Sequence, residues 1–589
     1  MACLALILIL SAIPAFAAQP PLEETVVVTA SAAPVPFENL SRTVTVLTRE
    51  DIVRLPVNSI ADVLAQALSV DVRSRSPHGM QSDISVRGSA FSQVLILVDG
   101  IRINNSQTGH HNSDFPVQLQ DVERMEVLLG AGSSLYGADA VGGVINIITR
   151  RRTETTEAAF SVGQFNFLEA SASTGFRKGS LQQSVSILAN RSSGFQYGRD
   201  FSAIAVSSRT QIGDQFGLFV SHTNKEFGAK GFYGPAPSRE WTNQTLVAAE
   251  HTHCSRSGLD TSVKLYYRTH GDRFQYDFRH PDLYENRHRT HAAGLLAQTR
   301  FGISDKGVLA VGGELGGDWI ASSNLGDHSY ARTSLFGELQ WMLGSSAIVY
   351  PGIRLDHYSN FGTSVSPSLS GSWWIAPRIR LRSSVGRSFR IPTFTEFLYR
   401  DPNHQANPLL EPESAWVAEI AADFIPAKEW LGFAAVYSRH ERNVIDWIRS
   451  SPDEKWRTYN IRELHAKGFE VGIERALGAE TRVAAHYSRI SMDAGKVDYQ
   501  SKYILDYARD TWTVKASVPI LPRLEYQNSL RYKRRIDGRS YWLLDGRVES
   551  RFRRFRLAFE FANLLDSQYQ EIIGVDMPGR YIAITLRTR

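Results

Sequence analysis

The histidines are the residues of this sequence with the most suggestive chemistry, because imidazole is a common ligand of iron and other transition metals. The chain has 16 histidines. Six of them fall between positions 251 and 291, namely His251, His253, His270, His280, His288 and His291, and His404 stands apart. No H-x-x-x-H spacing connects any of them. Solvent-facing loop histidines are therefore the alternative to a metal or haem ligand, and we predict no metal site and no cofactor.

Aromatic residues in turn-rich stretches indicate binding of a large ligand rather than catalysis. Phe232 and Tyr233 precede a Gly-Pro pair, and Tyr276 lies in a similar stretch. Rings with polar tips give a large ligand flat apolar surfaces that still form hydrogen bonds. Ser133 lacks the G-x-S-x-G frame of a nucleophile elbow, and neither a phosphate loop nor a zinc signature occurs. We therefore predict that the chain is not an enzyme.

The composition limits the architectures that can position these residues. The chain has 589 residues, of which 43% are hydrophobic and 11% aromatic, and its mean hydropathy is −0.22. After the N-terminus, no stretch reaches the about 18 apolar residues that a membrane helix needs. The chain is thus either soluble or a β-barrel, whose alternating strands do not raise average hydropathy. A net charge of +5 without a long basic run argues against a nucleic-acid partner.

Residues 1–18 have the features of a secretory signal peptide. An apolar run from Ala2 to Leu10 leads to Ala15-Phe16-Ala17, which fits an A-x-A cleavage site. We predict export and cleavage at this site. Cys254 is then the only cysteine left, so no intrachain disulfide can form.

A short β-forming stretch lies in the next segment, residues 19–36. It favours an extended backbone and comprises Glu24, Thr25, Val26, Val27, Val28, Thr29 and Ala30. Prolines flank it on both sides, and no partner strand is evident in the sequence. These features indicate a tethered strand that pairs with the edge of another protein. The alternative is the first strand of an ordinary domain.

Residues 37–150 have the pattern of a compact mixed α/β domain. Strands are predicted at 43–47, 84–88, 94–98, 122–128 and 142–149, and short helices open at Thr48 and Ser59. The sequences I-S-V-R-G, L-V-D-G and V-E-R-M-E-V-L-x-G-x-x-S-x-L-Y-G-A-D-A-V-G-G-V-I-N-I-I-T follow one another here. They resemble the plug domain of TonB-dependent outer-membrane receptors. Leu129 replaces the arginine of the usual Arg-Gly-Pro element, whose glycine is kept as Gly130.

Residues 151–589 alternate between apolar and charged side chains, as at 378–382 and 554–562. In a membrane barrel the apolar face meets lipid and the charged face lines the lumen. At roughly 20 residues per strand with its loop, this stretch fits about 22 strands. F-R-I-P at 389–392, N-P-L-L-E-P-E at 407–413 and N-L-L-D at 563–566 resemble barrel elements of the same receptors. The last strand ends on Arg589, where the family usually has an aromatic residue.

The resemblance implies an all-β membrane protein, an about 22-stranded transmembrane antiparallel β-barrel with a mixed α/β plug domain in its lumen. It further implies an outer-membrane receptor that imports a scarce nutrient. Residues 24–30 resemble the TonB box, which the periplasmic protein TonB grips under force from the inner-membrane proton gradient. A passive porin would need neither box nor plug, and residues 19–23 leave no room for a signalling domain. We expect a monomer surrounded by outer-membrane lipid and lipopolysaccharide.

The substrate is less determined by the sequence. Length and the D-A-V-G-G-V-I-N element at 139–146 look like the cobalamin-receptor branch. Its acidic calcium loops have no full counterpart here, because the matching loops offer only Asp200, Glu226 and Glu240. We predict a corrinoid ligand, with a ferric siderophore or haem as the alternative. His404 would be the ligand of a haem iron. The predicted ligand-binding residues are the plug apices and loop aromatics, His78, Gln81, Gln107, His110, Phe232, Tyr233 and Tyr276; His111 also lies at a plug apex.

Overall fold

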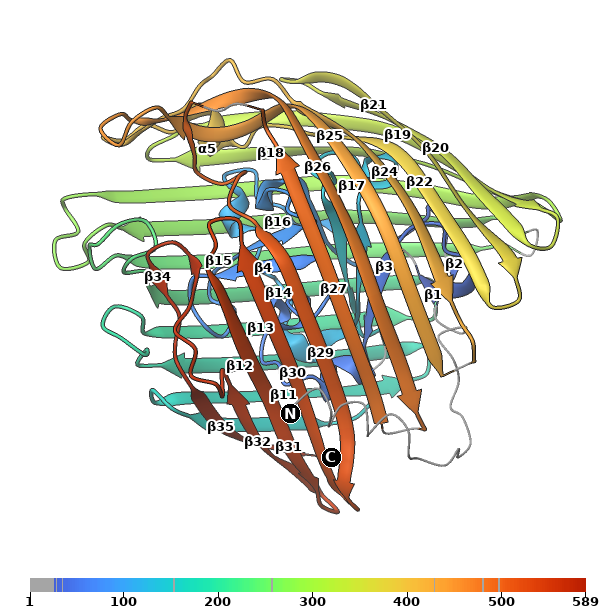
Figure 1. Ribbon diagram of the computed structural model, residues 1–589, viewed down its shortest axis with the longest axis horizontal. Helices are drawn as coiled ribbons and strands as arrows, with labels where there is room; N and C mark the ends of the chain where they lie inside the picture. Colours follow the sequence, from blue (N-terminus) through green and yellow to red (C-terminus); the bar gives the residue numbers. More distant parts are fainter. Residues whose placement is uncertain are drawn as a thin grey trace.

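The computed structural model describes residues 26–27, 29–33, 35–151, 154–255, 258–427, 429–478, 481–495 and 498–588. The predicted signal peptide 1–18, together with Glu24, Thr25 and Val28 of the predicted TonB box, lies outside the described residues. The chain forms a closed barrel that surrounds a smaller mixed domain, coloured blue in Figure 1. Among the helices of these residues, none has the length and apolarity to cross a membrane.

Twenty-two antiparallel strands form the wall, as the alternating sequence predicts. They follow one another in chain order around the barrel and are β10 (Glu157–Gly163), β11 (Phe167–Lys178), β12 (Leu181–Ser192), β13 (Phe201–Ile212), β14 (Phe216–Gly228), β15 (Arg239–Cys254), β16 (Asp260–Gln275), β17 (Glu285–Ser304), β18 (Gly307–Ser322), β19 (His328–Leu343), β20 (Ala347–Tyr358), β21 (Gly362–Ala376), β22 (Ile379–Arg390), β24 (Glu413–Phe424), β25 (Trp430–Arg449), β26 (Trp456–Leu477), β27 (Thr481–Asp493), β29 (Ala508–Leu521), β30 (Leu524–Arg535), β31 (Ser540–Arg551), β32 (Phe555–Ala562) and β35 (Tyr581–Thr588).

The wall closes where β35 pairs with both β32 and β10. The ending on Arg589 therefore does not prevent closure by the last strand. The wall is uneven in height, because β10 has 7 residues and β35 has 8, whereas β25 has 20 and β26 has 22. The seam is thus the lowest part of the wall.

Alternation along the strands sorts side chains between the two faces of the wall. On β32, Phe555 and Phe559 are exposed on the outer face, while Glu560 is buried inside and accepts a hydrogen bond from Arg547 at 2.9 Å. On β22, Arg380 and Arg382 are likewise buried inside. This outcome confirms the predicted facing of both segments and gives the barrel an apolar exterior.

The connections differ at the two ends of the barrel. One end, here the turn end, carries short turns such as 179–180, 305–306 and 522–523. The other, the loop end, carries the longer segments 193–200, 229–238, 276–284, 391–412, 494–507 and 563–580. Small elements in or beside these loops are α5 (Phe394–Leu398), β23 (His404–Gln405), β28 (Gln500–Ser501), β33 (Gln570–Ile572) and β34 (Val575–Asp576).

The inner domain is built on a five-stranded sheet and a hairpin. The sheet has the order β3 (Val44–Thr48), β8 (Val122–Leu129), β9 (Gly143–Thr149), β6 (Val94–Val98) and β7 (Ile101–Arg102), and the hairpin pairs β4 (Val70–Ser74) with β5 (Ser82–Val86). The helices are α2 (Arg49–Arg54), α3 (Ile60–Leu64) and α4 (Ser133–Tyr136), with short turns η2 (Phe37–Asn39), η3 (Phe91–Gln93), η4 (Gly109–His111) and η5 (Leu119–Asp121). The strands and helices predicted for residues 37–150 are therefore present.

Local sequence explains these elements. Thr48 and Asp51 form a capping box at α2, and the Ser59 side chain caps α3. Gly137 has φ +78°, and a Cβ there would lie 2.9 Å from Asp356 of the wall. Asn146, buried between apolar neighbours, accepts from the Gly100 amide at 3.1 Å. These contacts bear out the close packing and the hydrogen-bonded Asn146 that the sequence predicts.

The expectation that the N-terminal stretch has no partner strand in the chain is wrong. Val26 and Val27 form β1 (Val26–Val27), which pairs antiparallel with β2 (Val35–Pro36). The pairing reaches a partner only eight to ten residues ahead and uses an edge position, where a proline is tolerated in a strand.

Candidate functional site

The candidate ligand floor lies at the loop end, where turns of the inner domain meet the loops. We use the name floor for Gln81, Phe91, His110, Tyr233 and Tyr503. The His110 ring stacks on Phe91 with ring centroids 4.4 Å apart, and its Nε2 lies 3.3 Å from the Tyr503 hydroxyl. Gln81 Nε2 donates to the Tyr233 hydroxyl at 2.8 Å. The structure therefore brings three predicted ligand residues, Gln81, His110 and Tyr233, into one group.

The five floor residues carry no charge, and the adjacent Asp83 is paired with Arg75. Arg75 lies 2.8 Å from Asp83, whose other oxygen is 2.8 Å from His110 Nδ1. Burial lowers the pKa of His110 to about 4 against the opposing pull of Asp83. Burial raises the pKa of the Asp83 carboxyl, but Arg75 and His110 outweigh it and hold that pKa well below its usual range. His110 is therefore uncharged near neutral pH and donates from Nδ1 to Asp83.

The other predicted ligand residues surround the floor without joining it. Tyr276 is 37% exposed beside Gly234, and Phe232 is buried with the Arg199 guanidinium 4.5 Å from its ring centre. Gln107 is buried and donates to Asp272 at 2.9 Å. Ligand contact at these positions stays a prediction.

His78 packs against the barrel wall. Its ring stacks on Phe167 with centroids 4.1 Å apart and meets Tyr581 edge-on at 5.3 Å. Burial in this apolar setting lowers the pKa of His78 to about 4. The residue therefore contributes an aromatic contact between plug and wall, and its role toward a ligand is untested.

The histidines between 251 and 291 do not gather in space. His251 and His253 are exposed toward the turn end, His280 is exposed in a loop, and His291 bonds Tyr267 on the outer face at 2.7 Å. Only His270 and His288 are buried inside, because strand alternation separates neighbours in sequence.

His404 has both ring nitrogens engaged. Nδ1 lies 3.0 Å from Asp401, and Nε2 accepts from the Lys502 ammonium at 2.8 Å. Burial lowers the pKa of His404, which keeps the ring neutral. A haem iron would have to displace Lys502 before it could bind Nε2.

The acidic residues of the loops that could carry a calcium site are engaged in other contacts. Arg239 bridges Asp200 at 2.8 Å and Glu226 at 2.7 Å. Glu240 is buried inside the wall, 3.4 Å from Gln81 Nε2. The three acids therefore do not converge on a common point.

The end of the predicted TonB box is held at the base of the inner domain. The Thr29 amide donates to Glu126 at 2.9 Å, and the Thr29 hydroxyl accepts from Asn146 at 3.1 Å. Ala30 is buried in the core, and the Ala32 amide donates to Glu338 of the wall at 2.8 Å. Pulling on Val26 or Val27 would therefore load contacts of both the domain and the wall.

A buried ion-pair group that the sequence alone did not reveal joins the domain to the wall. Arg87 forms two hydrogen bonds to Glu470, at 2.8 and 2.7 Å, and lies 2.5 Å from Glu419. The arginine belongs to the I-S-V-R-G element, but its partners stand more than 300 positions later. Phe91 and Tyr503 of the floor were missed for the same reason.

Comparison with known proteins shows to which family this architecture belongs. Residues 163–564 match the family "TonB dependent receptor-like, beta-barrel", and residues 36–144 match "TonB-dependent Receptor Plug Domain". A curated relative, "Vitamin B12 transporter BtuB" of Photobacterium profundum, is 24% identical over 94% of this chain and 96% of its own. The namesake of Vibrio vulnificus is 24% identical over 76% of this chain and 75% of its own.

Solved structures show the same fold. The siderophore receptor PirA from Acinetobacter baumannii has a TM-score of 0.77 at 17% identity, covering 94% of this chain and 98% of that one. The PirA of Pseudomonas aeruginosa has a TM-score of 0.72 at 19% identity, covering 92% and 98%. With plug, barrel and family matches in agreement, this chain belongs to the TonB-dependent receptors, transport proteins of the outer membrane.

Proposed function

We propose that this receptor imports a corrinoid such as cobalamin across the outer membrane. The observation that carries the proposal is the neutral floor, where rings and neutral hydrogen-bonding groups face the loop end. Arg75 is matched by Asp83 and Lys225 by Asp114, whereas Lys502, whose ammonium lies 5.2 Å from the Tyr503 ring centre, bonds His404. A surface made mainly of rings and neutral hydrogen-bonding groups suits a large amide-bearing ring system better than a multiply charged anionic chelate, which would need several unpaired cations.

The curated relatives add independent support. A protein with the printed name of a vitamin B12 transporter aligns over 94% of this chain. The siderophore receptors share the fold at 17–19% identity. A ferric siderophore therefore remains the alternative ligand. The engaged nitrogens of His404 make haem the weaker alternative.

Energy coupling through TonB completes the proposed function. TonB would add its strand to residues 24–30 after the ligand has bound on the floor and the loops. The β1–β2 pairing and the Thr29 contacts are then the bonds that must open first. We further propose a signal peptide at 1–18, a box and linker at 19–36, a plug at 37–150 and a barrel at 151–589. In the described part of the chain the closed wall offers no free strand edge for pairing with a second copy, and we propose a monomer in lipid and lipopolysaccharide.

Titration of the purified receptor with cyanocobalamin, haemin and a panel of ferric siderophores tests the ligand. We expect cyanocobalamin to bind, with little effect of calcium or chelator, and Tyr233→Ala to weaken binding. Tyr267→Ala is the matched control, because Tyr267 lies on the outer face. A siderophore or haemin that binds while cyanocobalamin fails at micromolar concentration would overturn the corrinoid assignment. A haem ligand would in addition require a strong loss in His404→Ala and an altered Soret band.

A further inference from the structure

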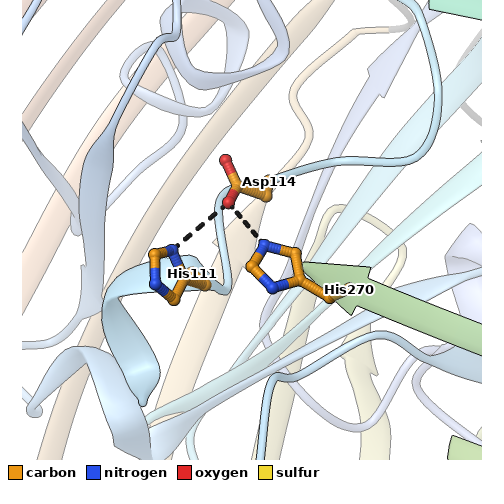
Figure 2. A group of neighbouring side chains, drawn as sticks. All are labelled: His111, Asp114 and His270. Carbon is orange, nitrogen blue, oxygen red and sulfur yellow. Dashed lines mark hydrogen bonds and ion pairs between the residues drawn. The ribbon is translucent and has the colours of Figure 1, made fainter. Parts of the chain in front are cut away.

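A group of histidines and carboxylates lies buried between the plug and the wall, next to the floor. His111 and Asp114 come from the plug turn at η4, and His270 comes from β16 (Figure 2). Asp114 Oδ2 lies 3.3 Å from His111 Nδ1 and 2.9 Å from His270 Nε2. All three residues are buried. Two imidazoles and one carboxylate thus converge from segments more than 150 positions apart.

The spacing of these atoms suits a tetrahedral metal ion. Zinc binds imidazole nitrogen and carboxylate oxygen at about 2.0–2.2 Å, which places tetrahedral ligand atoms about 3.3 Å apart. The ligand atoms of His111, Asp114 and His270 lie within 4.8 Å of one another, and those of His111, Glu240 and Asp272 form a second group of the same kind. Glu240 Oε1 lies 4.0 Å from the same His111 Nδ1 and can supply a fourth ligand. Two imidazoles with carboxylates favour a transition metal over calcium or magnesium, which take oxygen ligands.

The candidate ligands form hydrogen bonds with the kinds of group that orient metal ligands in other proteins. Asp272 lies 3.2 Å from His111 Nε2, the ring nitrogen that faces away from Asp114, and Gln107 holds Asp272 in place at 2.9 Å. A carboxylate on the far nitrogen of a metal-binding histidine fixes its orientation and raises its basicity. Lys225 binds Asp114 Oδ1 at 3.0 Å, which leaves Oδ2 for an ion.

Residues of this group and a neighbour also carry buried polar atoms without partners. Glu240 Oε2, Asp272 Oδ1 and His270 Nδ1 have no hydrogen-bond partner among the described residues, and neither has the Gln244 side chain. Gln244 lies directly across from His270 in the β15–β16 pairing. Such atoms are costly to bury unless something satisfies them. These unsatisfied groups on Glu240, Asp272, His270 and Gln244 are a second observation that points to a bound ion.

We propose that His111, Asp114, His270 and Glu240 form a binding site for a divalent transition-metal ion such as zinc. The bound ion would link the plug to strands β15 and β16. The ion replaces the ring protons that otherwise bridge to Asp114. Asp272 acts as a positioning residue through His111. The metal site is separate from the imported ligand, so its test needs no corrinoid and succeeds or fails independently of the proposed function.

Metal content gives the direct test. Because the site is buried, the full receptor should be refolded in detergent with Zn²⁺, washed with chelator and analysed by mass spectrometry. We expect one tightly held ion per chain in the native protein and its loss in the double variant His111→Gln, His270→Gln. His291→Gln, on the outer face, is the matched control and should keep the ion. Heat-modifiable mobility on gels verifies that each variant has folded.

Three further measurements distinguish a metal site from a plain ion-pair group. Protein refolded with Co²⁺ should show the intense ligand-field bands of tetrahedral coordination, absent from the double variant. Asp272→Asn should keep these bands while weakening Zn²⁺ binding by about 10- to 100-fold. Hydrogen exchange of residues 104–118 should slow with Zn²⁺ in the native protein only. Equal Zn²⁺ content in native and double-variant protein, or none in the folded native protein, would overturn the proposal.

Discussion

The N-terminal segment and the interior of the plug are held by different kinds of contact. At the base, Thr29 forms hydrogen bonds with Glu126 and Asn146 of the plug, and Ala32 forms one with Glu338 of the wall. In the interior, Arg87 is locked between Glu470 and Glu419. Loss of one hydrogen bond costs about 1 kcal/mol, whereas loss of one member of a buried ion pair costs about 3–5 kcal/mol. From this contrast we expect the N-terminal segment to be released while the ligand floor stays intact.

The strongest way to sharpen this contrast is Val27→Pro. Proline removes the amide donor of a strand position and is confined to edges and bulges. We expect uptake to be abolished while ligand binding at the cell surface stays close to native. Val27→Thr keeps the amide and the β-propensity and is the matched control. Parallel loss of uptake and binding in whole cells would contradict the separation of base and floor.

Arg87→Met tests the interior attachment. It leaves Glu470 and Glu419 buried without their partner, which costs about 3–5 kcal/mol when one member of a buried pair is removed. Hydrogen exchange and limited proteolysis should show a plug that opens far more often inside an intact barrel. The control is Arg482→Met, whose exposed pair with Asp51 also joins barrel to plug and contributes about 1 kcal/mol at most. Similar exchange in both variants would show that the Arg87 ion pairs hold the plug no more strongly than the exposed Arg482 pair does.

Acidification tests the plug contacts near the loop end. Burial lowers the pKa of both His78 and His110 to about 4, below the ordinary value of 6.5. The unfolded plug therefore binds protons that the folded plug does not, and stability falls as pH drops from about 6.5 toward 4. By pH 5 each histidine should cost roughly 2 kcal/mol. Protection factors of plug amides, corrected for the intrinsic slowing of exchange at lower pH, should fall between pH 7 and 5, less so in His78→Phe. Protection factors that do not change over this range would contradict the neutrality of both rings in the folded plug.

Thr29→Val is the substitution with the smallest expected effect. The shape of the side chain is kept, but Asn146 loses the hydroxyl oxygen to which it donates, at a cost of about 1 kcal/mol. Without ligand, the N-terminal segment should become more accessible to protease, and binding on the floor should not change. Ser41→Ala, which removes a plug–wall hydrogen bond to Ser370, is the control that leaves Thr29 in place. Equal protease access in native and Thr29→Val protein would mean that the Thr29 bond does not restrain the segment.

Local patterns were sufficient to predict the fold but not the site. The capping box at Thr48, the alternation around Phe559 and the buried Asn146 all follow from neighbours in the sequence. The β1–β2 pairing was missed because two-residue strands carry almost no periodic signal. The floor could be predicted in part, since Gln81, His110 and Tyr233 lie at apices and loops. Contacts such as Arg87 with Glu470 require the closed barrel, which brings distant segments together.

The low seam has a consequence for the surrounding membrane. β32 and β35 have 8 residues each, about 27 Å of strand. At a tilt of about 40° they reach only about 21 Å across, less than the about 25 Å of a typical apolar band. By this measure, lipid beside β10, β32 and β35 would have to shorten its tails, or the bilayer would have to thin locally. The receptor would then have a thin side, toward which hydrophobic mismatch would steer short-chained lipids and equally short neighbouring proteins.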